Sequence, residues 1–179
     1  ASDLLPQTLR WGLLIGRQNT AELLELRSGL EIYVARLAAA RATPEAIAEL
    51  SVAVERMSES IGQLTDFARA DAEFHQALST AADNRTLVDL LHVVRSLLQV
   101  YADRAVHDEA AARLAIAEHE TIFRAVERRD ENAAAAAMAT HMSTASARLP
   151  AEAARPAPCP PPPQADRGVL APSDRGRAG

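Results

Sequence analysis

Hydrophobic residues recur every three or four positions from residue 19 to residue 149, which is the spacing of one face of an α-helix. This stretch holds a single proline, Pro44, and two glycines, so nearly continuous helical structure is expected. The pattern predicts an all-α protein, an antiparallel bundle of about six helices. The expected helices cover roughly residues 19–41, 43–62, 65–83, 85–107, 108–129 and 130–148.

Residues that favour helix N-termini stand at the expected breaks. Thr43 is followed by Pro44, a combination of capping hydroxyl and first-turn proline that starts the second helix. Asp108 and Asp130 are expected to cap the fifth and sixth helices in the same way.

The apolar stripes indicate which side of each helix faces the core. In the first helix the expected inward residues are Leu23, Leu26, Leu30, Val34 and Leu37. In the third they are Phe67, Phe74, Leu78 and Ala82. In the fourth they are Leu87, Leu90, Leu91, Val94, Leu97, Leu98 and Tyr101. The first and fourth helices are apolar over more than one stripe, which favours a homodimer formed through helix faces.

Polar groups interrupt these apolar faces at four positions. Asp71 and His75 are one helical turn apart on the inward face of the third helix, and His119 and His141 lie on the stripes of the fifth and sixth. A buried carboxylate must be paired with a neighbour or bind a cation. Three imidazoles and one carboxylate from three helices of a bundle form a plausible metal shell. Neutral imidazole with one carboxylate suits a divalent ion, with Zn favoured and Ni, Fe, Mn or Cu as alternatives.

Two other interpretations of these residues stay open at this level. A helical metalloenzyme acting on a small carboxylic acid would use a similar shell, because catalytic zinc also keeps an open position. A purely structural bundle would hydrogen-bond the same histidines in its core. A ferritin-like di-iron site is disfavoured, since Glu118 and Glu120 flank His119 at the wrong spacing. His92 and His107 are expected to face solvent.

The composition of the chain excludes several classes of function. The chain has 179 residues and a net charge of -5, and all its basic residues are arginine, so nucleic-acid binding by this chain alone is not expected. Its single cysteine, Cys159, excludes an intramolecular disulfide and favours the cytoplasm. No apolar run approaches 18 residues, so no membrane span is expected.

The domain organisation follows from shifts in composition. Residues 1–18 are interpreted as a linker or lead-in segment, and residues 19–149 as a helical domain that binds a metal and an effector. Residues 150–179 contain eight of the ten prolines and are expected to form a disordered tail.

Several motifs together resemble a known family. They are Leu26-Arg27-Ser28-Gly29-Leu30-Glu31, Asp71-x-x-Phe74-His75-x-x-Leu78 with Ala81 and Asn84, Glu118-His119-x-x-Ile122 with Ala125 and Asp130, and Met138-x-x-His141-Met142. In this order they resemble the ligand-binding C-terminal (FCD) domain of FadR-subfamily GntR-type transcription regulators, over about residues 19–149. The resemblance implies a helical bundle, a homodimer, a small organic acid effector and metal ligands at Asp71, His75, His119 and His141. It also implies regulation of operator DNA binding by a winged helix-turn-helix. The 18 residues before Asn19 are too few for that domain, so the chain is expected to be either a fragment or a regulator that lacks it.

Arg27 is the first candidate for binding an effector. It lies on the apolar stripe of the first helix, and a guanidinium there requires an anion. The anion is either Glu31, one turn further on, or an effector carboxylate that also reaches the metal. Arg95 on the fourth helix is a weaker candidate for the far end of the ligand, and Asn84 completes the predicted effector-binding set.

Overall fold

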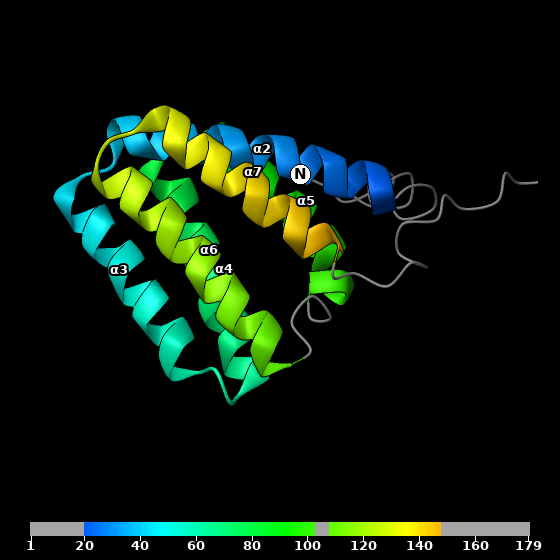
Figure 1. Cartoon of the computed structure of the whole chain (residues 1–179). Coiled ribbons are helices and arrows are strands. Elements are labelled where there is room, and N and C mark those ends of the chain that lie inside the picture. Colours follow the sequence, from blue (N-terminus) through cyan, green and yellow to red (C-terminus); the bar gives the residue numbers. More distant parts are fainter. Residues whose placement is uncertain (1–19, 103–107, 148–179) are drawn as a thin grey trace, which may run out of the picture.

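The computed structural model describes residues 20–102 and 108–147, and it contains six α-helices in these two ranges (Figure 1). They are α2 (Thr20–Arg41), α3 (Pro44–Glu59), α4 (Leu64–Ala81), α5 (Arg85–Ala102), α6 (Glu109–Glu127) and α7 (Glu131–Ala147). The predicted all-α bundle is confirmed. The predictions for residues 1–18, for His107 and for residues 150–179 fall outside the described residues.

The predicted capping residues start their helices. The hydroxyl of Thr43 accepts a hydrogen bond from the backbone N–H of Ala46 at 3.2 Å, at the start of α3. The carboxylates of Asp108 and Asp130 each accept from the N–H three residues further on, at 2.8 Å and 2.9 Å. Each cap satisfies a first-turn N–H that has no partner within its own helix. The second helix ends slightly earlier than expected, with Ser60 at its C-terminal cap.

Neighbouring helices pack in an arrangement that brings α4, α6 and α7 around one interior region. Figure 1 shows α2 and α7 side by side along one side of the bundle, with α3 on the opposite side. In addition, α3 packs on α4 and α6, α6 packs on α7, and α2 contacts α4, α5 and α6. Helix α2 therefore adjoins the three helices that carry the predicted metal ligands.

The core confirms most of the predicted inward faces, including all four apolar residues named for the third helix. Two assignments were wrong: Leu26 is 48% exposed and Leu90 is 41% exposed. Helix α2 buries Val34, as predicted, together with Ala35, Ala38 and Ala39. Because α2 is apolar on several sides, its leucine pattern did not define which side meets α7. The small alanine side chains allow the helix axes to approach closely.

Within the described residues, no helix is both long enough and apolar enough to cross a membrane.

Candidate metal centre

The four predicted metal ligands meet at one place inside the bundle. Asp71 and His75 come from α4, His119 from α6 and His141 from α7. One possible ligand atom from each lies within 4.8 Å of the others. The three imidazoles are buried, whereas the side chain of Asp71 is 30% exposed and forms the accessible side of the cluster.

Each imidazole is held by an acceptor at its Nδ1 atom. The Nδ1–H of His119 donates to the backbone carbonyl of Ala115 at 2.7 Å. The Nδ1–H of His75 donates to a carboxylate oxygen of Glu31 at 3.2 Å, and that of His141 to a carboxylate oxygen of Glu118 at 2.9 Å. Carbonyl and carboxylate oxygens accept hydrogen bonds, so these partners favour the tautomer in which Nδ1 carries the proton in all three rings.

This tautomer leaves a lone pair on each Nε2 atom. Among the described residues, Nε2 of His75 and Nε2 of His119 are buried without a hydrogen-bond partner. The Nε2 atom of His119 lies 3.3 Å from Oδ1 of Asp71, where two electron-pair donors face each other with no proton between them. Buried polar atoms are normally satisfied, and a cation is the group that would satisfy this set. The residues therefore fit a metal ion bound by three nitrogens and one oxygen.

The electrostatics agree with a set of metal ligands at neutral pH. Burial lowers the pKa of the His75 imidazole and lowers the pKa of His119 to about 3, so both rings are neutral. Although burial acts to raise it, the pKa of the Asp71 carboxyl is lowered overall, so Asp71 is ionised. Neutral imidazoles and an ionised carboxylate are the forms that bind a divalent cation.

Glu31, which the sequence suggested only as a helix-surface partner of Arg27, is a buried carboxylate. Its side chain is fully buried and accepts from Arg95, Arg27 and His75. Burial alone would raise the pKa of the Glu31 carboxyl, yet His75, Arg95 and Arg27 together hold that pKa well below its usual range. A signal for this burial was present in the sequence, since Glu31 lies one turn before Ala35 and two turns before Ala38.

The two predicted effector arginines are both beside this carboxylate. The Nε atom of Arg27 lies 3.4 Å from Oε1 of Glu31, and the Arg27 side chain is 15% exposed. Arg95 donates to both oxygens of Glu31 at 2.9 Å. The side-chain oxygen of Asn84 accepts from the N–H of Leu87 at 3.2 Å, so this residue caps α5.

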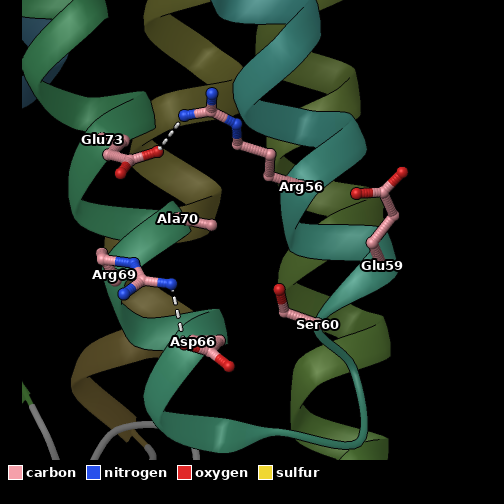
Figure 2. Close-up of a pocket in the computed structure, with 7 residues that line it drawn as sticks. All are labelled: Arg56, Glu59, Ser60, Asp66, Arg69, Ala70 and Glu73. Carbon is pink, nitrogen blue, oxygen red and sulfur yellow. Dashed lines mark hydrogen bonds and ion pairs between the residues drawn. The ribbon is translucent and has the colours of Figure 1, made fainter.

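An open pocket between α3 and α4 lies elsewhere on the molecule (Figure 2). Its arginines bind neighbouring carboxylates: Arg56 contacts Glu73 at 2.8 Å and Arg69 contacts Asp66 at 2.7 Å. The pocket is lined by residues from these two helices and from the Ser60 turn, and it contains none of the four predicted metal ligands.

The chain is similar to a known domain family and to several named transcription regulators. The FCD domain family model matches residues 22–144. The transcriptional regulator LutR of Bacillus subtilis is 33% identical over 146 residues, which cover 78% of this chain and 66% of LutR. The galactonate operon transcriptional repressor of Escherichia coli is 30% identical, with 70% and 55% covered. The transcriptional repressor NanR of Salmonella schwarzengrund is 33% identical, with 69% and 48% covered. The chain thus spans about half to two thirds of the length of these relatives. All three are regulators, which confirms the expectation of a regulatory domain that is not an enzyme.

Solved structures show the same fold. Escherichia coli McbR/YncC aligns with a TM-score of 0.66 at 18% identity, covering 70% of this chain and 61% of that one. A GntR protein of Streptococcus agalactiae aligns with a TM-score of 0.61 at 25% identity, covering 72% and 57%.

Proposed function

The chain belongs to the FCD domain family, and on that premise we propose that it is the effector-sensing domain of a FadR-subfamily GntR-type transcription regulator. The names of the relatives LutR and NanR describe them as helix-turn-helix (HTH) type transcriptional regulators. In the intact protein, effector binding to this domain would control how a winged helix-turn-helix binds operator DNA.

The first part of the proposal is one divalent metal ion per chain, held by Asp71, His75, His119 and His141. The observation that carries it is the convergence of three imidazoles and one carboxylate. Among the described residues, the buried Nε2 atoms of His75 and His119 have no hydrogen-bond partner. The donor set of three nitrogens and one oxygen favours Zn, with Ni, Fe or Mn as alternatives.

The second part is a small organic acid as effector. Asp71 is the exposed member of the cluster, so a ligand would approach from its side. Arg27 is partly exposed, and its charge contributes to lowering the pKa of the Asp71 carboxyl. A carboxylate could therefore contact the metal and be bound by Arg27 through charge-assisted hydrogen bonds. Arg95 would contribute positive charge from behind Glu31, and Asn84 could contribute only its amide nitrogen, because its oxygen caps α5.

The third part is a homodimer. Leu26 and Tyr33 are 48% and 50% exposed on α2, and Leu90 and Val93 are 41% and 48% exposed on α5. These two helices contact each other, and large apolar side chains exposed on adjacent elements are typical of protein interfaces. We assign the dimer surface to these four residues.

The test is elemental analysis of protein purified without chelator, followed by thermal-shift measurements with short carboxylic and hydroxycarboxylic acids. About one equivalent of metal is expected, together with acid-dependent stabilisation that is lost after metal removal. A chain that takes up no divalent metal would instead be a structural bundle with hydrogen-bonded histidines.

A further inference from the structure

We propose that Glu31 is a positioning residue for the metal centre, which orients His75 toward the ion from a helix that supplies none of the four predicted ligands. This inference rests on the proposed metal binding.

The contact that carries the proposal joins α2 to α4. The carboxylate oxygen Oε2 of Glu31 accepts from Nδ1–H of His75 at 3.2 Å, and both side chains are buried. A ring held in this way presents the lone pair of Nε2 to the cluster. In the other tautomer Nε2 would carry a proton and could not bind a metal. Acceptors at the second nitrogen of metal-binding histidines fix the ring orientation and raise its basicity.

Glu31 is itself held firmly in place by Arg95. The guanidinium binds the two carboxylate oxygens at 2.9 Å each, which fixes the plane of the carboxylate. The same Nη2 atom lies 3.2 Å from the backbone carbonyl of His75 and 3.0 Å from the hydroxyl of Ser79. Arg95 therefore fixes both the backbone of His75 and the acceptor of its ring.

The other two histidines are oriented from within the helices of the cluster. His119 donates to Ala115, one turn earlier in α6. His141 on α7 donates to Glu118 on α6, which also accepts from the hydroxyl of Thr144. His75 differs because its acceptor is 44 residues away in the sequence, on α2. The position of α2 in the bundle thus determines the orientation of one predicted ligand.

Arg27 has a different relation to Glu31. Its single contact is 3.4 Å long, against two contacts of 2.9 Å from Arg95. Glu31 would keep Arg95 and His75 as partners if Arg27 turned toward an effector. The network therefore separates a positioning arginine, Arg95, from an arginine available for a ligand, Arg27.

The experiment measures Co²⁺ and Zn²⁺ affinity by competition with a chelator, and the Co²⁺ absorption spectrum, in the full chain. Glu31→Gln retains one oxygen that can accept from the His75 ring, so metal affinity should fall by about tenfold. Glu31→Leu removes both oxygens, and metal affinity should fall by about 100-fold. The Co²⁺ spectrum should change in both variants. Two controls separate this effect from others: Glu109→Gln removes a surface carboxylate, and Leu50→Ala weakens the core on α3, a helix that carries none of the four predicted ligands.

Unchanged affinity and spectrum in Glu31→Gln and Glu31→Leu would overturn the proposal, as would changes no larger than those in Leu50→Ala. If the single variants do not fold, the double variant Glu31→Gln with Arg95→Gln removes the buried carboxylate together with the guanidinium that pairs with it.

Ring ¹⁵N NMR of the wild-type protein provides a check that needs no variant. His75 should be protonated on Nδ1 with and without metal, and a proton on Nε2 would contradict the role of Glu31. A wild-type chain that binds neither ion refutes the proposed metal site, while the NMR measurement still tests the Glu31–His75 contact.

Discussion

Arg95 donates to both carboxylate oxygens of Glu31 at 2.9 Å, although the two residues are 64 positions apart in the sequence. The Glu31 side chain is fully buried and that of Arg95 is 18% exposed, so the pair joins α2 to α5 at the edge of the core. The same carboxylate contacts His75, which connects this ion pair to the predicted metal ligands.

Replacing Arg95 by Met should destabilise the metal-free protein by about 3–5 kcal/mol. Glu31 would keep a buried negative charge with only the long contact to Arg27 and the hydrogen bond from His75. Urea unfolding at pH 7 measures the loss. Arg56→Met is the matched control, since it breaks the exposed pair with Glu73 and should cost less than about 1 kcal/mol. Equal losses in the two variants would show that the Glu31–Arg95 pair contributes no more than a surface ion pair.

The metal-free protein should lose stability as the pH falls below about 6.5. Burial lowers the pKa of His119 to about 3, whereas an unfolded histidine titrates near 6.5. Between these values the unfolded chain binds a proton that the folded chain excludes, so the free energy of unfolding decreases with falling pH. From pH 7.5 to pH 5 this one group should remove about 2 kcal/mol, and the lowered pKa of His75 adds a change of the same sign.

Urea titrations of chelator-treated protein at several pH values check this expectation. In His119→Gln the pH dependence should be weaker. Stability that is constant between pH 7.5 and 5 would mean that His119 binds a proton in the folded state.

His119→Ala and His141→Ala should each lower the metal content, because each removes one of four proposed ligands. Elemental analysis after dialysis gives the stoichiometry, and thermal unfolding shows the accompanying loss of stability. His92→Ala is the control, since His92 is exposed on α5. Full occupancy in both ligand variants would place the metal elsewhere.

Arg27→Ala should weaken acid binding more than tenfold while leaving the metal content unchanged. A charged hydrogen bond contributes about 1.5–3 kcal/mol, which corresponds to that change in affinity. Calorimetry with short carboxylic and hydroxycarboxylic acids measures the affinity. Arg27→Lys keeps the charge but loses the planar fork and should bind with intermediate affinity. Wild-type affinity in Arg27→Ala would leave Arg27 as a structural partner of Glu31.

A negative charge on the assigned dimer surface should produce monomers. Tyr33→Glu and Leu90→Glu each introduce a carboxylate into an exposed apolar area on α2 or α5, and desolvating that charge opposes association. Sedimentation at micromolar concentration measures the oligomeric state. Leu114→Glu, at a residue 49% exposed on α6, should leave the wild-type state unchanged. A wild-type chain that is already monomeric would contradict the proposed homodimer.

The sequence alone was sufficient to predict where the helices lie and which face of most helices points toward the core. Helical periodicity and N-terminal caps are local properties, so Thr43, Asp108 and Asp130 could be read directly as helix starts. The same periodicity placed His75, His119 and His141 on inward faces, because each helix turns its own stripe toward the core. Their types and their inward position on separate helices were enough to predict a shared cluster with Asp71.

Tertiary packing determined which residues contact the histidines of that cluster from α2 and α5. Helix α2 is apolar around much of its circumference, so its sequence allowed several orientations, and its contacts with α4, α5 and α7 selected one. That orientation exposes Leu26 and buries Glu31. The partners of Glu31 come from α4 and α5, and no local pattern could bring His75 and Arg95 to the same carboxylate. The burial of a charge depends on how distant segments neutralise it, and that depends on the three-dimensional packing of the helices.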